Sequence, residues 1–241
     1  MKLWPVTGLI IGTLLSAASA MADSALSLYK AEYKTKVAGL NVTLTRTLTE
    51  KNGRYHLSQG GSKAFMVKLS EDSRFSVEGD QIVGEQFVYQ MSGISNRRRE
   101  VIFDEEAGTI RSLRKEEWTE HPWSPGVLDR LSQQEQMRLK LLLAEAPPKR
   151  ISLSIIDGPK IKVKHFDLIE TAVLETPVGA LNTVHYRLIH EEPDERSSDT
   201  WLAVDHDFLM VRTEHVEKGS KTVIDLEGAT VAGQAISGRA R

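Results

Sequence analysis

The sequence lacks cysteine altogether and is poor in aromatic residues, which make up 6% of its 241 positions. The absence of cysteine excludes disulfide bonds, thiol nucleophiles and the attachment of a lipid to a cysteine after a cleaved leader. A hydrophobic core must therefore stabilise the protein. The chain is long enough to form one, because a domain of this size buries about 70% of its unfolded surface.

Motifs of several enzyme and cofactor classes are also missing. The chain has no G-x-S-x-G elbow, no G-x-x-x-x-G-K-[ST] loop, no dinucleotide fingerprint, and no H-x-x-x-H or H-E-x-x-H zinc motif. His185 and His190 are five residues apart in a predicted strand, so they should point to opposite faces. We therefore expect no metal, no cofactor and no enzymatic activity.

The N-terminus has the features of a secretory signal peptide. Lys2 is followed by an apolar run over residues 3–15 and then by small residues as far as Ala22. The run is shorter than the ~20 residues of a membrane-spanning helix. We expect residues 1–22 to be removed, which leaves Asp23 as the start of a periplasmic protein that is not lipidated.

The remaining chain is close to neutral and has no further apolar run of membrane length. The formal net charge of the whole chain is −2. This value argues against nucleic acid as a partner. We expect the partner to be an envelope lipid, an amphiphile or a periplasmic protein, and we expect no transmembrane segment in the mature chain.

Alternation of apolar and polar residues is the dominant pattern after the leader. In residues 29–37 the odd positions are Tyr, Ala, Tyr, Thr and Val, whereas the even positions are Lys or Glu. This period of two is typical of an antiparallel strand with one buried face, and Asn52-Gly53 predicts a hairpin turn. We predict a mainly β fold for residues 23–232. It would be a strongly curved antiparallel sheet of about ten to twelve strands, a half-closed or closed barrel.

One helix is predicted midway along the chain, near residues 132–145. Ser132 and Glu135 have the spacing of a capping box, in which both side chains bind amides of the first turn. Good helix formers follow until Pro147 and Pro148 end the helix. The last segment, residues 233–241, is small, polar and basic, and we expect it to be a flexible tail.

Four arginines are candidates for an anion-binding patch. Arg97, Arg99, Arg111 and Arg114 lie on two segments that are predicted to pair as a hairpin. On a shared face they would bind an anionic partner, such as a lipid headgroup or a polyanionic glycan. The alternative, which we favour from the sequence, is a solvated face whose charge is balanced by neighbouring carboxylates.

Three tryptophans are candidates for the mouth of a ligand site. Trp118 and Trp123 lie near two prolines before the predicted helix, and Trp201 lies in a later strand segment. Aromatic side chains at such positions either line an opening or fill the end of a barrel. The residues alone do not decide between these two roles.

The run Asp205-His206-Asp207 has the residue types of a metal or acid–base site. It lies between two apolar strand segments, and its residue types favour tight turns because they bind their own backbone. We interpret it as a hairpin loop whose side chains face solvent.

Three segments resemble signatures of DUF3108, a family of secreted bacterial β-rich domains without assigned chemistry. The matching residues are Asp129 and Ser132, then Glu175-Thr176-Pro177 with Gly179, then Trp201-Leu202-Ala203 with Asp205 and Val211-Arg212. The family usually has proline before the Val-Arg pair, where this chain has Met210. The resemblance implies a secreted β-rich domain and identifies no catalytic residue.

These observations lead to three functional hypotheses. The first is a non-catalytic periplasmic protein that binds an apolar or amphiphilic envelope ligand within the curved sheet. The alternative is a periplasmic interaction scaffold without a small ligand, and the third is a glycan hydrolase that uses paired carboxylates. An apolar cavity of several hundred Å³ would favour the first hypothesis, and a packed interior would favour the second.

Overall fold

The structure, a computed structural model, describes residues 25–37, 40–63, 67–93 and 96–239. Its sixteen strands belong to a single sheet. The strands are β1 Tyr29–Val37, β2 Leu40–Lys51, β3 Arg54–Lys63, β4 Val67–Glu78, β5 Gln81–Gly93, β6 Arg97–Asp104, β7 Thr109–Arg114, β8 Glu117–Pro122, β9 Val127–Leu128, β10 Arg150–Ile156, β11 Ile161–Thr176, β12 Gly179–Leu188, β13 Arg196–Ala203, β14 Leu209–Glu217, β15 Ser220–Val231 and β16 Gln234–Ala235. The helices are α1 Ser132–Leu143 and a 3-10 turn, η1 Val204–His206.

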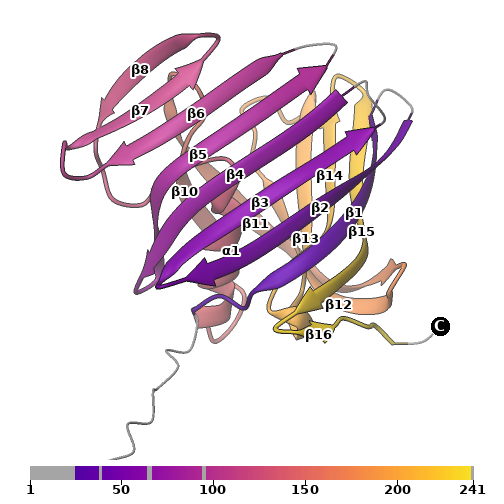
Figure 1. The fold of residues 1–241 in the computed structure, drawn as a ribbon. Helices are drawn as coiled ribbons and strands as arrows, with labels where there is room; N and C mark the ends of the chain where they lie inside the picture. Colours follow the sequence, from indigo (N-terminus) through magenta and orange to yellow (C-terminus); the bar gives the residue numbers. More distant parts are fainter. Residues whose placement is uncertain (1–24, 38–39, 64–66, 94–95, 240–241) are drawn as a thin grey trace, which may run out of the picture.

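The chain builds this sheet from its centre to one edge and then from the other edge back to the centre. Strands β1 to β8 follow one another as antiparallel neighbours, strands β10 to β15 do the same, and β15 pairs with β1. The short strand β9 pairs in parallel with β10. In Figure 1, β1–β8 form one curved wall, β10–β15 form the other, and α1 lies between the two walls.

The sheet curls so far that its β9 edge lies against β5 of the opposite wall, and α1 contacts both β5 and β10. The two edge strands, β8 and β9, are not hydrogen-bonded to each other, so the sheet is not closed. The predicted curved, mostly antiparallel fold with one mid-chain helix is confirmed. The strand number exceeds the expected one partly because β9 and β16 have two residues each, too few to show alternation.

The alternation in the sequence decides which side chains are buried. In β1, Tyr29, Ala31 and Tyr33 are buried while Lys30 and Glu32 are exposed. Asn52 and Gly53 have φ of 56° and 78°, which confirms the predicted hairpin between β2 and β3 as the primed type that suits twisted strands. The local pattern therefore accounts for individual strands and turns.

The capping box predicted at the start of α1 is not formed. Instead, the Asp129 carboxylate accepts hydrogen bonds from the amides of Leu131 and Ser132, at 2.7 and 2.9 Å. The Ser132 hydroxyl donates to Asp129 Oδ2 at 2.8 Å. Glu135 is bound by Tyr29, 106 positions away in the chain, and no local pattern contains such a contact.

The C-terminal segment, predicted to be a flexible tail from residue 233, is hydrogen-bonded over the part that the structure describes. β16 pairs with β15, and the amides of Gly238 and Arg239 donate to the carbonyl oxygens of Val178 and Ala180 at 2.8 and 3.0 Å. Ile236 is buried. The tail is therefore docked on β15 and on the β11–β12 turn, and its one large apolar side chain is buried.

Replacing Ile236 with alanine should lower the free energy of unfolding by about 2 kcal/mol, because the buried side chain would leave a cavity. Urea denaturation would measure this change. Ser237→Ala, at the exposed neighbouring position, is the control and should leave stability nearly unchanged. Equal stability of both variants, together with unprotected amide exchange at Gly238 and Arg239, would show that the tail is not docked in solution.

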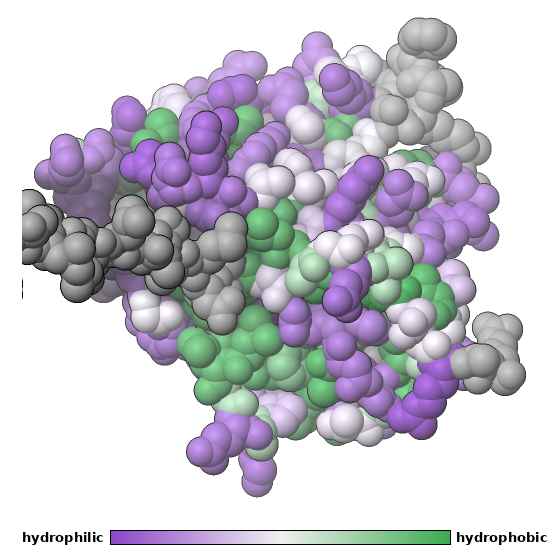
Figure 2. Space-filling view, turned by 60° about the horizontal axis from the view of Figure 1, so that its bottom comes forward, coloured by the Kyte–Doolittle hydropathy of each residue, from purple (hydrophilic) through white to green (hydrophobic). Residues whose placement is uncertain are grey.

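The surface carries apolar side chains on several different elements. Figure 2 looks at the end of the molecule that lies at the bottom of Figure 1, where green apolar surface is surrounded by hydrophilic residues. Large apolar side chains that are exposed are Trp118, Leu143, Val163, Ile169, Val173 and Ile189. Three of these six lie on β11, and single exposed apolar residues of this kind are ordinary on protein surfaces.

The predicted signal peptide, residues 1–22, lies outside the described residues. In the ranges that the structure does describe, no helix has both the length and the apolar character needed to cross a membrane.

Candidate functional site

The concave side of the sheet is occupied by α1, which buries charged as well as apolar side chains. Glu135 and Arg138 are each 1% exposed. Arg138 Nη1 donates to Glu135 Oε2 at 2.6 Å, and its guanidinium carbon lies 4.9 Å from the centre of the Tyr29 ring. The Tyr29 hydroxyl donates to Glu135 Oε1 at 2.7 Å. Directional bonds therefore tie the helix to β1.

The tyrosine hydroxyls on β1 are held as donors. Burial, together with the Glu135 carboxylate, raises the pKa of Tyr29 above its ordinary value. Burial raises the pKa of Tyr33 to about 12, and its hydroxyl donates to the Met210 carbonyl oxygen at 2.9 Å. Because Met210 takes part through its backbone, the proline that is usual there in DUF3108 could accept the same bond.

A second buried arginine joins the helix to the next strands. Arg46 on β2 donates to Gln59 Oε1 at 2.8 Å and also to the Gln134 side chain. Gln59 in turn donates to Glu71 Oε2 at 3.1 Å. The polar groups under the helix thus have partners, and these bonds connect α1, β2, β3 and β4.

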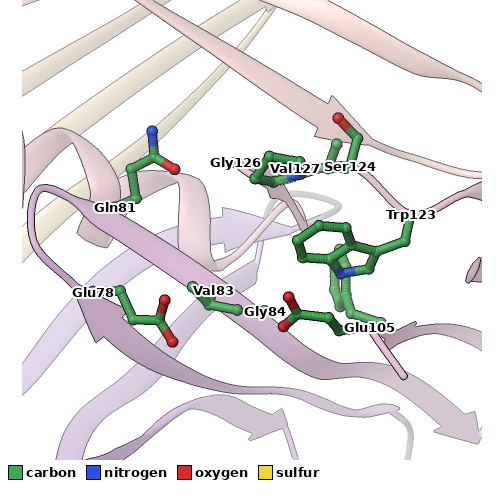
Figure 3. A pocket seen from close by; sticks show the side chains of 11 residues that line it. Glu78, Gln81, Val83, Gly84, Glu105, Trp123, Ser124, Gly126 and Val127 are labelled. Carbon is green, nitrogen blue, oxygen red and sulfur yellow. The ribbon is translucent and has the colours of Figure 1, made fainter. Parts of the chain in front are cut away.

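The larger of the two best-defined pockets in the described residues has a volume of about 120 Å³. Its lining comes from β4, β5, the β6–β7 turn and the segment before β9, and Figure 3 shows Glu78, Glu105 and Trp123 around it. The smaller pocket, of about 10 Å³, lies between α1 and the strands around it. Neither pocket approaches the several hundred Å³ of a typical ligand site.

The three candidate tryptophans do not form one mouth. Trp118 is exposed on β8, where the Arg111 guanidinium carbon lies 5.4 Å from its ring centre. Trp123 is half-buried and lines the 120 Å³ pocket. Trp201 on β13 stacks on His185 of β12 with 4.2 Å between ring centres. Of the three, only Trp123 borders one of these two pockets.

The four candidate arginines do not share one face. Arg99 and Arg114 are directly opposite each other in the β6–β7 pair, and Arg97 is two residues from Arg99 on the same side. Arg111 is three residues before Arg114, and successive residues of a strand alternate between faces. Arg111 therefore points to the other face, where it meets Trp118. The predicted patch of four arginines therefore reduces to Arg97, Arg99 and Arg114 on one face.

The structure brings together a polar group that the sequence did not reveal. The Ser198 hydroxyl lies 2.7 Å from His215 Nδ1 and 3.0 Å from His190 Nε2. His215 Nε2 is 3.7 Å from Glu217 Oε2. This group could be predicted only if the pairing of β13 with β14, which places Ser198 opposite His215, were known.

This Ser198 group resembles the serine–histidine–carboxylate sets of nucleophilic enzymes, but its hydrogen bonds differ. The hydroxyl is held by two histidines, because it can donate one hydrogen bond and accept others. Glu217 is paired with Arg196 and lies beyond hydrogen-bond distance of His215. Burial, with Arg196 and His215 nearby, lowers the pKa of His190. The group is suited to bridging β13, β14 and the segment after β12.

Trp201 covers a buried ionic group. His185 Nε2 lies 2.6 Å from Asp199 Oδ1, and Arg187 Nε donates to the same oxygen at 2.8 Å. His185 and Asp199 are both buried. Stacking of Trp201 on His185 removes this pair from water, which explains the tryptophan by packing.

The run Asp205-His206-Asp207 connects β13 to β14 as a short turn. Asp205 is exposed and accepts a hydrogen bond from Asn182 Nδ2 at 2.7 Å, and Asp207 has a φ of 53°. In the described part of the chain, no group of three or more His, Asp or Glu side chains could hold a metal ion. The run is thus a hairpin loop, but of its three residues only Asp205 is exposed, whereas His206 and Asp207 are half-buried.

The other residues that resemble DUF3108 signatures also have structural partners. Thr176 Oγ1 donates to the Gly179 carbonyl oxygen at 2.7 Å in the β11–β12 turn. Arg212 Nε donates to Asp225 Oδ1 at 2.5 Å between β14 and β15. These contacts join neighbouring strands, so the motif residues are explained by the fold.

Comparison with solved structures shows where this fold occurs. The crystal structure of a β-barrel-like protein of the domain of unknown function DUF1849, from Brucella abortus, superimposes with a TM-score of 0.55 at 11% identity and covers 86% of this chain and 98% of that chain. This chain shares the fold of that domain. No family model and no curated protein matches the sequence.

Two further structures align over similar lengths with lower scores. A protein described as a lipoprotein from Parabacteroides distasonis gives a TM-score of 0.31 at 12% identity, covering 84% of this chain and 95% of that chain. A protein described as exported, with a YmcC-like fold, from Bacteroides fragilis gives 0.28 at 9% identity, covering 86% and 96%. These scores are too low to support an argument about this chain.

Proposed function

We propose that this chain is an exported, non-catalytic protein of the bacterial envelope that binds its partners through surface groups, as an interaction scaffold. The observation that carries the proposal is the position of α1. The helix takes up the concave side of the sheet, where a carried apolar ligand would lie, and Glu135 and Arg138 hold it there. The structure therefore supports the scaffold hypothesis over a ligand carried inside the sheet.

Export to the periplasm is supported by the leader-like residues 1–22, which have no cysteine after them for lipid attachment. Membership of DUF3108 belongs to the same proposal. It is supported by the order of the motif residues along the chain, from Asp129 to Arg212.

The absence of catalysis is likewise part of the proposal. It is supported by the sequence, which contains none of the common nucleophile or phosphate-loop motifs. It is also supported by the Ser198 group, in which the hydroxyl is held on both sides and Glu217 is bound by Arg196.

Native mass spectrometry of protein purified from its own cell envelope tests the proposal. The expected result is the mass of a polypeptide that starts at Asp23, with no apolar molecule bound in stoichiometric amount. The same sample sprayed from denaturing solvent is the control and should give the same mass. An uncharged lipid that is released only on denaturation would contradict the proposal, because only an interior site would hold its apolar chains.

One observation favours a second candidate function, the binding or hydrolysis of a glycan. The carboxylates of Glu78 and Glu105 lie around the 120 Å³ pocket beside the Trp123 ring. An aromatic face and two carboxylates are groups that sugar-cleaving enzymes use. Release of sugar from a cell-wall glycan fragment that is lost in Glu105→Gln would favour this candidate over the scaffold.

A further inference from the structure

Cationic side chains from separate segments meet where the β10–β11 turn approaches β6 and β7. We call Arg99, Arg114, Arg130 and Lys164 the basic cluster. Arg99 and Arg114 are opposite each other in the β6–β7 pair. Arg99 Nη1 lies 3.3 Å from Asp157 Oδ1 in the β10–β11 turn, so this turn from one wall contacts the other wall.

The β10–β11 turn is shaped to let Arg114 lie across it. Gly158 has a φ of +69°, and a Cβ atom at this position would be 2.4 Å from Arg114 Cδ. Glycine suits this backbone conformation, and it leaves free the space that the Arg114 side chain occupies. The arginine is therefore held against the turn, beside Asp157 and Arg99.

Tyr89 on β5 brings a third arginine to the same place. The guanidinium carbons of Arg99 and Arg130 lie 5.5 and 5.6 Å from the centre of its ring. Two like charges thus share one aromatic ring, which attracts both through its electron-rich face. The ring orients the two guanidinium groups without neutralising them.

The neighbouring carboxylates do not balance these charges. Arg130 Nε lies 3.1 Å from Glu71 Oε1, but Glu71 also accepts a hydrogen bond from Gln59, which is bound to the buried Arg46. Asp157 is exposed, as is Glu117 opposite Arg114. The four cations of the basic cluster thus have two ion-paired carboxylates, Glu71 and Asp157, with Glu117 opposite Arg114.

Lys164 on β11 is the least compensated member of the cluster. Among the described residues, its ammonium group has no hydrogen bond and no ion pair. Burial lowers its pKa, and the nearby Arg130 and Lys162 lower it further, while Asp157 acts in the opposite direction. An ammonium group that is partly removed from water and crowded by cations costs stability unless an anion joins it.

We propose that the basic cluster binds a phosphate-bearing group, either the headgroup of an anionic lipid or a soluble phosphoester. Guanidinium groups bind phosphate oxygens in pairs, and a lysine adds a compact charge. The inference rests on the proposed function and names the chemistry of one partner. It assigns to Arg99 and Arg114 the role that the sequence suggested for four arginines, and it replaces Arg97 and Arg111 with Arg130 and Lys164.

Binding of two probes by the mature chain tests this inference. Calorimetry with pyrophosphate examines a soluble phosphate, and co-sedimentation with phosphatidylcholine vesicles, with and without phosphatidylglycerol, examines a lipid headgroup. We expect Arg114→Gln and Lys164→Gln each to weaken binding about tenfold, the loss of one charge-assisted hydrogen bond. Arg111→Gln is the matched control, because it removes the same charge from the same strand on the other face, and it should bind as the unchanged protein does.

Each outcome either identifies the source of the phosphate group or contradicts the inference. Binding of pyrophosphate identifies a soluble phosphoester, and binding only of the phosphatidylglycerol vesicles identifies a lipid headgroup. No binding of either probe, or an equal loss in Arg111→Gln and Arg114→Gln, overturns the inference. Thermal unfolding checks that the variants fold, and Lys164→Gln should be at least as stable as the unchanged protein. An interior lipid found by native mass spectrometry would instead contradict the proposed function, whatever these probes show.

Discussion

Replacing Arg138 with methionine should lower the free energy of unfolding by about 3–5 kcal/mol. The substitution leaves the Glu135 carboxylate buried without its cation, 2.6 Å from where Nη1 had been. It also removes the guanidinium from the Tyr29 ring and from the carbonyl oxygen of Asp207, to which Arg138 Nε donates at 3.1 Å. Urea denaturation followed by circular dichroism would measure the loss.

Two further variants test whether the unpaired buried charge, and not the loss of packing, makes Arg138→Met unstable. The double variant Glu135→Leu with Arg138→Met removes both charges, so it should recover much of the stability that the single variant loses. Arg150→Met breaks an ion pair with Asp167 in which the arginine is exposed, and should leave the urea midpoint nearly unchanged. If Arg138→Met and the double variant were equally unstable, the unpaired carboxylate would not be the cause.

Replacing Asp129 with alanine should cost about 3 kcal/mol, because it leaves buried donors without an acceptor. The amides of Leu131 and Ser132 both donate to this carboxylate, and Ser73 Oγ donates to its other oxygen at 2.7 Å. The same residue therefore starts α1 and ties it to β4. Asp129→Asn should cost less, since the amide oxygen can still accept the two backbone hydrogen bonds.

The difference in stability between the unchanged protein and Asp129→Asn should also depend on pH. Burial raises the pKa of Asp129 from its ordinary value of 3.8, although its hydrogen bonds act in the opposite direction. Folding therefore favours the protonated acid. This contribution is complete below pH 3.8 and is lost as the pH rises through the raised value. The stability of the unchanged protein relative to Asp129→Asn should fall over that window and then stay constant.

An exposed aspartate provides the control for Asp129. Asp104 Oδ1 accepts a hydrogen bond from the amide of Ala107 at 2.9 Å in the exposed β6–β7 turn. Asp104→Ala should cost only about 0.5 kcal/mol, as surface substitutions generally do. A loss as large as that of Asp129→Ala would show that burial of the carboxylate is not what makes Asp129 important. A difference between Asp129→Asn and the unchanged protein that does not vary with pH would contradict the raised pKa.

Much of the fold could be predicted from the sequence, because strands and turns are local. The alternation in residues 29–37 decided which side of β1 is buried, and Asn52-Gly53 decided the type of the following turn. The mid-chain helix was also predictable from its helix formers and the two prolines after it. These features depend on a few neighbouring residues, which the sequence presents together.

The candidate site could not be predicted in the same way. Alternation alone should have separated Arg111 from Arg114, but the partners of Arg114 on the β10–β11 turn and of Arg99 on β5 come from distant segments. Lys164 and Arg130 are 34 positions apart and meet because the sheet curls. Residues that are far apart along the chain cannot be recognised as one cluster until the pairing of strands is known.

The sequence by itself determined that this protein is a cysteine-free β-sheet with one helix and a leader-like N-terminus, since these properties depend on composition and short-range periodicity. Only the tertiary structure decided what occupies the concave side. Glu135 resembled a helix cap in the sequence, but burial between β1 and Arg138 made it part of an ionic anchor. A charged group removed from water must find a partner, and the folded chain, rather than the local sequence, selects that partner.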